Sequence, residues 1–252
     1  MSMPEVLLKE VSKRFAETEV LRGISLSVER GEFVSIIGPS GCGKSTLLKM
    51  VAGLSSSSGG EIQVNCMTPK NARELVSFVF QDATLLPWRT VERNVALALE
   101  LEGRTREETA NTVAKLLELV GLEKVGKSYP RQLSGGMKMR VSIARALATR
   151  PRLLLMDEPF AALDEITRDR MNEELLRLRE EQNWTVMFVT HSVAEAVFLS
   201  SRVIVLAPHP GRIAQEIEVD LPFPRTEATR ESDAYDELVN RTSRLLREAH
   251  RL

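Results

Sequence analysis

The chain has 252 residues, and its 34 Lys and Arg side chains nearly balance 35 Asp and Glu side chains, giving a formal net charge of −1. This balance gives no electrostatic basis for nucleic acid as the main ligand. A chain of this length can form one large domain or two modest ones, each with a proper core. Its two cysteines, Cys42 and Cys66, are far apart in sequence and match no metal-site spacing. Because Cys42 lies in a glycine-rich loop, we expect no disulfide framework, which fits a reducing cytoplasm.

Two features of the sequence bear on membranes. Charged residues near the start, among them Glu5, Lys9 and Glu10, occupy the stretch where a signal peptide would need an apolar segment. No apolar run approaches the roughly 20 residues that span a bilayer. We therefore expect a soluble, cytoplasmic chain whose role at a membrane would depend on a partner.

The first part of the chain leads to a glycine-rich loop. Residues 5–30 alternate polar and apolar side chains, which predicts two edge strands. Residues 33–37 predict a buried strand and residues 47–52 predict a helix. Between these lies the nine-residue loop Gly38, Pro39, Ser40, Gly41, Cys42, Gly43, Lys44, Ser45 and Thr46. It matches the G-x-x-x-x-G-K-[ST] pattern of a phosphate-binding loop in the required strand and helix context.

The chemistry of this loop suits a nucleotide. Its glycines let backbone N–H groups turn toward a polyphosphate at the positive end of the helix dipole. Lys44 supplies a charge near the β- and γ-phosphates, and the Ser45 hydroxyl can ligate Mg²⁺. Phe15, upstream at the end of a polar turn, has two interpretations: a core anchor, or a ring stacked on the nucleotide base.

Another predicted strand ends at a polar amide. Residues 61–64 and 75–80 predict strands, and Gln81 directly follows the second one. An amide past the C-terminal end of a buried strand in an α/β sheet lies where ligands bind, although an ordinary strand-ending residue is the alternative.

The loop after Gln81 is unusually apolar. Leu85, Leu86 and Trp88 lie within it, beside a proline, and turn chemistry does not require such side chains. They either fold back onto the core or form a docking surface for a partner helix.

Residues from about 88 to 150 predict a helical subdomain. Thr90 can cap a helix over 91–101, a periodic pattern over 106–120 ends at Gly121, and a third helix is expected over 138–149. Before this last helix lie Ser134, Gly135 and Gly136. A serine with two glycines at a helix start is a second anion-binding geometry, or a simple helix cap.

Two later strands end in side chains that suit nucleotide hydrolysis. Residues 153–156 are apolar and lead to Asp157 and Glu158. Asp157 is placed to hold Mg²⁺, and Glu158 is placed to polarise a water for attack on the γ-phosphate. A strand over 185–190 ends at His191, a switch residue or a structural histidine.

The rest of the chain predicts a solvated helix over 171–182 and a last core strand over 203–207. Beyond residue 225, the spacing of Tyr235, Leu238 and Leu245 predicts an amphipathic helix that docks on the body. We therefore divide the chain into residues 1–225 and a C-terminal helix within 226–252.

Together, these motifs resemble the ATP-binding subunit of an ABC transporter over essentially the whole chain. GPSGCGKST (38–46), the glutamine after VSFVF, LSGGM (133–137), LLLMDEP (153–159), AALD (161–164) and THS around His191 occur in the family's order. The resemblance implies an α/β P-loop NTPase core with a parallel sheet, an N-terminal antiparallel β subdomain and an inserted helical subdomain.

The resemblance also implies individual roles. Phe15 would stack on adenine, and Gln81 would report on the metal and the attacking water. Ser134, Gly135 and Gly136 would contact the γ-phosphate, as would His191. Asp164 would lie in the loop that crosses to the other subunit. The implied ligands are ATP and Mg²⁺.

The implied assembly is a head-to-tail homodimer in which each ATP lies between one subunit's phosphate loop and its partner's LSGG turn. Within the family, LLPW (85–88), EAVF (195–198) and PGRI (210–213) resemble the importers of nitrate, sulfonates and taurine. This implies an ATP hydrolase coupled to transmembrane transport, peripheral on the inner face of the cell membrane, with permease subunits and a solute-binding protein as partners.

Two alternatives remain at this stage. Relatives with a similar THS variant resemble transporters of pyrimidine-type vitamin precursors, and Met139 and Ser192 depart from residues frequent in the family. The alternative from a different class is a soluble ABC ATPase without a transport role. That class would predict tandem cassettes, a coiled-coil insertion or a basic surface, and the sequence has none of them.

Overall fold

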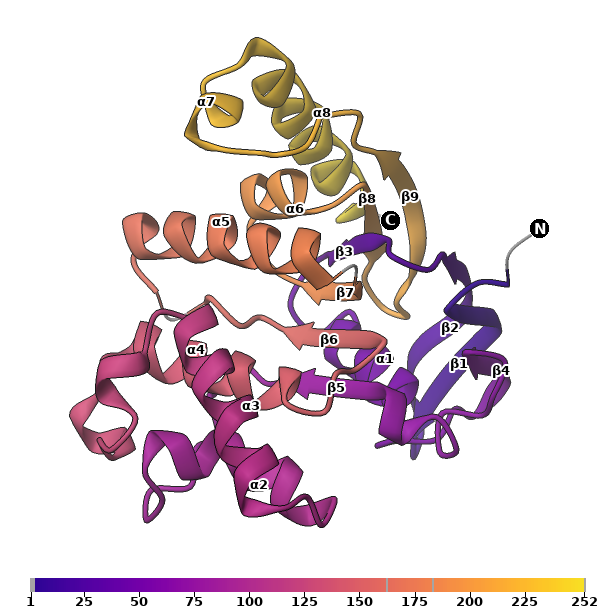
Figure 1. Ribbon diagram of the computed structural model, residues 1–252. Helices are drawn as coiled ribbons and strands as arrows, with labels where there is room; N and C mark the ends of the chain where they lie inside the picture. Colours follow the sequence, from indigo (N-terminus) through magenta and orange to yellow (C-terminus); the bar gives the residue numbers. More distant parts are fainter. Residues whose placement is uncertain (1–2, 162, 183, 252) are drawn as a thin grey trace.

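The computed structural model describes residues 3–161, 163–182 and 184–251, so Ala162 of the AALD motif and Leu252 of the C-terminal segment lie outside the described residues. A six-stranded sheet with the order β5-β6-β7-β3-β8-β9 forms the centre (Figure 1). Its strands are β3 (Phe33–Ile37), β5 (Val76–Val79), β6 (Leu153–Asp157), β7 (Thr185–Val189), β8 (Arg202–Ala207) and β9 (Arg212–Glu218). Neighbouring strands run parallel except for β9, which pairs antiparallel with β8.

Both faces of this sheet are covered, which explains why its inner strands are continuous apolar runs. Along β6, Leu154 and Met156 point into one core cluster, while Leu153 and Leu155 point into the other. The helices are α1 (Lys44–Val51), α2 (Val91–Leu101), α3 (Arg106–Leu119), α4 (Gly135–Leu147), α5 (Glu165–Gln182), α6 (Val193–Leu199), α7 (Glu227–Arg230) and α8 (Asp233–Ala249).

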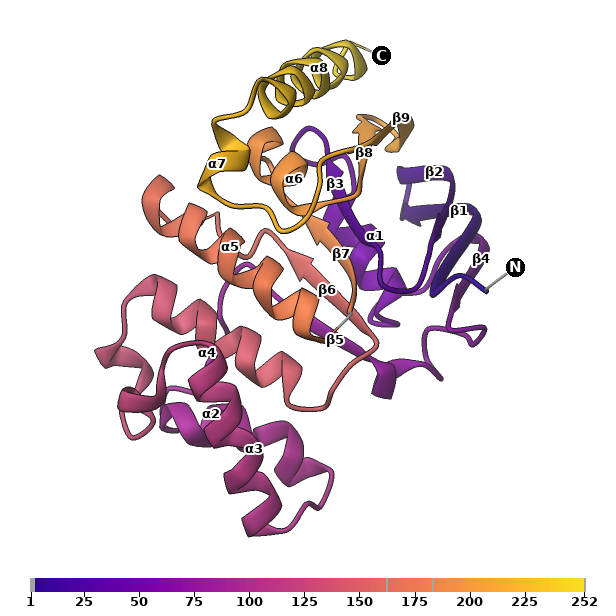
Figure 2. The same cartoon turned by 45° about the horizontal axis from the view of Figure 1, so that its top comes forward.

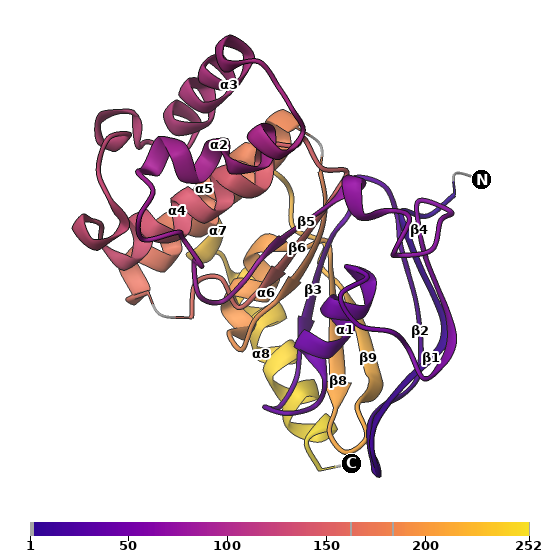
Figure 3. The same ribbon diagram turned by 90° about the horizontal axis from the view of Figure 1, so that it is seen from below.

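A second, smaller sheet lies beside the first. It consists of β1 (Val6–Phe15), β2 (Thr18–Val28) and β4 (Gly59–Val64) in the antiparallel order β2-β1-β4. Helix α1 lies between this sheet and the six-stranded sheet (Figure 3), and apolar residues of all three share one core cluster. The phosphate loop therefore joins a central strand to a helix that is held on both sides.

Helices α2, α3 and α4 form a separate group at one side of the molecule (Figure 1). The chain leaves the sheet after Val79 and returns at Leu153, although β5 and β6 are paired neighbours. The predicted cap is confirmed, because the Thr90 side chain accepts a hydrogen bond from the Arg93 amide. Gly121, with φ +66, follows the end of α3 as predicted.

Several element predictions were incomplete. The strand β9 was not predicted; only Ile217 of its seven residues is buried, so this edge strand carries almost no apolar pattern. The short helix α6 was also missed. Helix α4 begins at Gly135 rather than at 138, and α5 begins at Glu165 rather than at 171, because Ser134 and Asp164 cap them earlier.

The C-terminal segment packs on the body, as its apolar spacing predicts. Tyr235 is buried, and Leu238 and Leu245 pack against the same core cluster. In Figure 2, α8 lies at the top of the molecule, on the outer side of α6 and β8. The Tyr235 hydroxyl donates a hydrogen bond to the Ala194 carbonyl at 2.9 Å. The division of the chain at residue 225 stays a prediction.

One buried arginine holds this segment to α6. Arg225 donates from Nη1 to the carbonyls of Val197, Phe198 and Ser200 at 2.9 to 3.0 Å, and from Nη2 to Leu221 at 3.0 Å. These carbonyls include the last ones of α6, which have no partner within the helix. Burial lowers the pKa of the Arg225 guanidinium to about 10, still well above neutral pH. None of the helices in the described part of the chain combines the length and hydrophobicity needed to cross a membrane.

We expect Arg225→Met to lower the free energy of unfolding by about 2–4 kcal/mol, because it leaves buried carbonyls without donors while keeping most of the side-chain volume. Chemical denaturation measures this. The matched control is Arg244→Met on the exposed side of α8, which should change stability by less than about 0.5 kcal/mol. Equal effects of the two substitutions would contradict the capping role.

Candidate functional site

Lys44, Ser45, Asp157, Glu158 and His191 lie at or after the ends of three adjacent parallel strands, and Gln81 follows the neighbouring strand β5. In the sheet, β7 lies between β6 and β3, so the segments after their carboxyl ends meet at one edge. A cleft of about 360 Å³ opens there. It is lined by Val20, Ser40, Gly41, Gly43, Lys44, Ser45, Thr46, Gln81, Glu158 and His191.

The phosphate loop has the shape that its glycines predict. Gly43 has φ +98, and a Cβ there would lie 2.6 Å from Leu21 Cδ2. A Cβ on Gly38 would lie 2.8 Å from the Leu206 carbonyl oxygen. Neither position can hold a larger residue without displacing the core, so the loop is packed tightly against β2 and β8.

Lys44 is buried at the first turn of α1, with 4 % of its surface exposed. Its ammonium donates hydrogen bonds to the carbonyls of Gly38 at 2.9 Å and Pro39 at 3.0 Å. The loop therefore holds a positive charge at the positive end of a helix, which is an anion-binding arrangement.

The side chain of Cys42 packs beneath the loop. It is fully buried and belongs to the apolar cluster there, and the Cys42 amide donates to the Pro39 carbonyl at 3.3 Å. Burial raises the pKa of the Cys42 thiol, although the nearby Lys44 charge acts in the opposite direction. The Cys42 side chain is thus a packing residue, and its part in phosphate binding stays a prediction.

Ser45 and Asp157 meet below the loop. The Ser45 hydroxyl donates to Asp157 Oδ1 at 2.8 Å, and Asp157 is 8 % exposed at the end of β6. A hydroxyl beside a carboxylate offers hard oxygen donors, and Mg²⁺ binds through one or two protein oxygens together with substrate phosphates. This donor pair therefore fits the metal that the phosphate loop implies.

Glu158 and His191 form the other side of the cleft. His191 Nε2 lies 2.6 Å from Glu158 Oε1, and the side chain of Glu158 is 14 % exposed while that of His191 is 46 % exposed. Glu158 has φ +50, and its amide donates to the Val189 carbonyl at 2.9 Å. A carboxylate held by an imidazole at the mouth of a cleft can accept a proton from a bound water.

The comparisons with known proteins agree with this geometry. The family model described as ABC transporter matches residues 21–161. The chain belongs to the ABC transporter family. An aliphatic sulfonates import ATP-binding protein, SsuB, from Bacillus cereus is 43 % identical over 237 residues, covering 92 % of each chain. The SsuB protein of Bacillus licheniformis is 46 % identical over 218 residues, covering 86 % of this chain and 84 % of that one.

Solved structures of ABC cassettes are also similar. The dimeric cassette MJ0796 bound to ADP and Pi has a TM-score of 0.76 and 35 % identity, and the match covers 86 % of this chain and 100 % of that one. The Clostridium perfringens protein cbiO1, part of an ABC transporter complex, has a TM-score of 0.81 and 26 % identity over 99 % of this chain and 98 % of that one. The predicted P-loop NTPase fold is therefore confirmed, and the chain is an ATP-binding cassette.

The remaining predicted site residues do not line this cleft. Ser134 caps α4 by accepting from the Met137 amide at 3.3 Å. Asp164 caps α5 by accepting from the Thr167 amide at 3.0 Å, a bond that lowers the pKa of its carboxyl. A Cβ on Gly136 would lie 3.3 Å from Thr167 Cγ2, so the LSGG turn and the Asp164 loop are neighbours. They form a separate group on the same cassette.

Phe15 is not the core anchor that one interpretation allowed. Its ring is 51 % exposed at the end of β1, and Lys13 Nζ lies 4.6 Å from the ring centroid. An exposed ring agrees with the stacking interpretation, which stays a prediction. The ring is not among the side chains that line the cleft.

Two residues near His191, Thr190 and Glu195, have no individual role predicted from the sequence. Glu195 is 5 % exposed and accepts a hydrogen bond from the buried Thr190 hydroxyl. Burial raises the pKa of Glu195 to about 7, against the effects of Thr190 and Arg168, with Asp169 and Glu158 adding to the rise. The spacing of Ser192 and Glu195 matches a helix-capping box and could have drawn attention to this carboxyl.

The raised pKa predicts how stability depends on pH. Ionised Glu195 is disfavoured in the folded state, so its contribution is most favourable below about pH 4.5 and is lost as the pH rises through about 7. Relative to Glu195→Gln, the free energy of unfolding of the unmodified chain should therefore fall by up to about 3 kcal/mol across this range. Denaturant titrations of both proteins at several pH values measure the difference. Parallel pH profiles would contradict the burial of an ionisable carboxyl.

Proposed function

We propose that the chain is the ATP-hydrolysing subunit of an ABC importer, working as a homodimer with two transmembrane permease subunits and a solute-binding protein. It would lie on the inner face of the cell membrane. The observation that carries this proposal is the cleft that joins the phosphate loop to Glu158 and His191, with Asp157 behind Ser45.

The described residues suggest how the reaction proceeds. Lys44 and the amides of the loop would bind the phosphates of ATP, and Ser45 with Asp157 would hold Mg²⁺. When bound, Mg²⁺ supplies positive charge that neutralises the phosphate oxygens. Glu158 would accept a proton from the attacking water, and His191 would hold the carboxylate and contact the γ-phosphate. Gln81, at the mouth of the cleft, would orient that water.

The homodimer follows from the separation of two anion-binding turns. Ser134, Gly135 and Gly136 do not line the cleft of their own cassette, and Asp164 lies beside them. A second copy turned head to tail would bring this group opposite the phosphate loop. A ligand that bridges two subunits drives closure in proportion to its preference for the closed state. The relative MJ0796 was solved as a dimer bound to ADP and Pi, which supports this arrangement.

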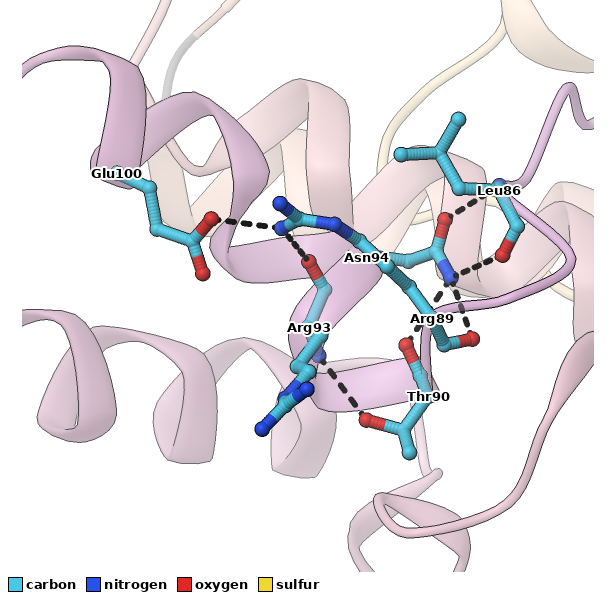
Figure 4. Close-up of polar contacts among 6 residues, drawn as sticks. All are labelled: Leu86, Arg89, Thr90, Arg93, Asn94 and Glu100. Atoms are coloured by element: carbon cyan, nitrogen blue, oxygen red, sulfur yellow. Dashed lines mark hydrogen bonds and ion pairs between the residues drawn. The ribbon is translucent and has the colours of Figure 1, made fainter.

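The loop after Gln81 supports a permease contact. Leu85 packs against the core and Leu86 is half-buried, whereas Trp88 is 71 % exposed. Buried Asn94 fixes this loop: its side chain accepts from the Leu86 amide at 2.8 Å and donates to the carbonyls of Leu86, Arg89 and Thr90 (Figure 4). Trp88 is thus presented on a loop that the hydrogen bonds of Asn94 hold in place.

Trp88 lines a hollow together with Arg93, Glu100 and Arg106, and these three residues also line a neighbouring groove. Its volume is about 470 Å³, and helices α2 and α3 form its walls. Ala96, Ala110 and Val113 provide an apolar lining, and charged side chains including Arg93 and Glu100 lie around it. Apolar grooves with polar rims are typical of protein interaction sites, where aromatic anchors contribute much of the affinity. A cytoplasmic helix of the permease would fit this surface.

For the transported solute we propose only a chemical class. The relatives named for aliphatic sulfonate import favour a sulfonate or a similar small solute of the nitrate and taurine class over a pyrimidine-type precursor. Because this subunit need not contact the solute, the direct experiment is a binding measurement with the partner solute-binding protein. Binding of a sulfonate, and no binding of a pyrimidine, is the expected result.

We expect Glu158→Gln to bind ATP but to reduce hydrolysis at least about 100-fold, because an amide cannot accept the proton from water. The variant should accumulate as a closed dimer in MgATP, as measured by size-exclusion chromatography. Lys44→Ala in the same assay should lose ATP binding and remain monomeric. Full turnover by Glu158→Gln, or ATP-dependent dimers of Lys44→Ala, would contradict these assignments.

Trp88→Ala should leave ATP binding and thermal stability of the free subunit near those of the unmodified chain, because the side chain is exposed. Affinity for the permease should fall by about 2 kcal/mol or more, as for a central aromatic anchor. Leu54→Ala removes another exposed apolar side chain, in a loop away from α2, and serves as the control. A loss of thermal stability in the free Trp88→Ala subunit, with permease assembly intact, would contradict the role of Trp88 as an anchor for the permease.

A further inference from the structure

The turn that carries His191 is short and heavily bonded. It links the end of β7 at Val189 to the start of α6 at Val193. His191 is the residue of this turn whose side chain reaches across to Glu158. The residues on either side of it, Thr190 and Ser192, point their hydroxyls toward the turn itself and the first turn of α6.

Three hydrogen bonds close this turn. The Ser192 hydroxyl accepts from the Glu195 amide at 3.2 Å, as an N-cap does. In a capping box the Glu side chain would return the bond to the Ser192 amide. Here that amide donates to Thr190 Oγ1 at 3.0 Å, and the Thr190 hydroxyl donates to Glu195 Oε2. The Thr190 hydroxyl therefore stands between the Ser192 amide and the Glu195 carboxylate, which bond directly in an ordinary capping box. In this way it links the residues on both sides of His191 to Glu195.

The network is enclosed. Thr190 is 4 % exposed and Glu195 is 5 % exposed, while Glu195 Oε1 has no hydrogen-bond partner among the described residues. Arg168 and Asp169 of α5 and Glu158 after β6 are the charged groups that act on the carboxyl, and the Tyr235 hydroxyl of α8 lies near it as well. A buried carboxyl with a free oxygen is costly, so one that serves stability alone would be better replaced by an apolar residue.

The same turn fixes the partner of His191. The Val189 carbonyl accepts from the Glu158 amide at 2.9 Å, and the Thr190 amide donates to the Ile36 carbonyl at 3.3 Å. The end of β7 thus holds the backbone of Glu158 on one side and the strand that leads into the phosphate loop on the other. These backbone bonds do not fix the direction of the chain after Thr190. The hydrogen bonds of Glu195 with Thr190 and Ser192 do so.

We propose that Glu195 is a positioning residue for ATP hydrolysis: through the Thr190 hydroxyl it fixes the turn that aims His191 at Glu158. This inference rests on the proposed hydrolytic function of the cleft. Glu195 is not among the residues that line the cleft. Its removal should therefore affect the chemical step and leave ATP binding in place.

The test compares Thr190→Val, Glu195→Ala and Glu195→Gln in the full chain, alone and assembled with its permease. Affinity for ATP, KM and kcat are measured, with thermal unfolding of each variant. Thr190→Val keeps the shape of the residue and removes only the relay. We expect kcat to fall about 10- to 100-fold in Thr190→Val and Glu195→Ala, the scale for a misplaced catalytic group, with ATP affinity nearly unchanged. Glu195→Gln keeps an acceptor oxygen and should restore most of the rate.

Thr242→Val is the matched control, because Thr242 is also a fully buried threonine but lies in α8. It should leave kcat unchanged. Unchanged kcat in folded Thr190→Val overturns the inference, as does a rise in KM at constant kcat. Should Glu195→Ala fail to fold, Thr190→Val decides the outcome. An unmodified chain that hydrolyses no ATP, alone or with permease, would overturn the proposed function and this inference together.

Discussion

The site depends on the neighbourhood of three parallel strands. Because β7 lies between β6 and β3, the residues that follow these strands share one edge of the sheet. Lys44 and Ser45 come after β3, Asp157 ends β6 and Glu158 follows it, and His191 follows β7. Strand pairing brings together the segments that follow these strands, and the turns after the strands then place their side chains. The bond from Ser45 to Asp157 and the pair of Glu158 and His191 depend on both.

Much of this arrangement is predictable from the sequence because its signals are local. The phosphate loop is a continuous stretch whose glycines, lysine and hydroxyl act through their own backbone and the next helix. The strands β3, β6 and β7 are fully buried, so each is a mostly apolar run, and Asp157 ends β6 while Thr190 follows β7. A polar side chain after such a run lies at the ligand-binding edge whatever the order of the strands.

Other features lack a local signal. Strand β9 has one buried residue and is held by its pairing with β8, which no periodicity reveals. The burial of the Cys42 side chain depends on contacts with elements far away in sequence. The link from Glu195 to Thr190 resembles an ordinary helix cap until the relaying hydroxyl is seen in three dimensions. In the proposed head-to-tail homodimer the site would also be divided between two copies, so a single chain would display its LSGG turn without the nucleotide loop opposite it.

The backbone of Glu158 narrows the choices open to evolution at this position. Its φ of +50 lies in the left-handed region, where glycine, asparagine and aspartate are the residues at ease. None of these three could place a carboxylate at the same reach, so the residues that suit the main chain are those that fail the chemistry. Glutamine shares both the length and the conformational preference of glutamate. Under the proposed function, a glutamine at this position would therefore keep the length of the side chain and the conformation of the turn while removing the proton acceptor.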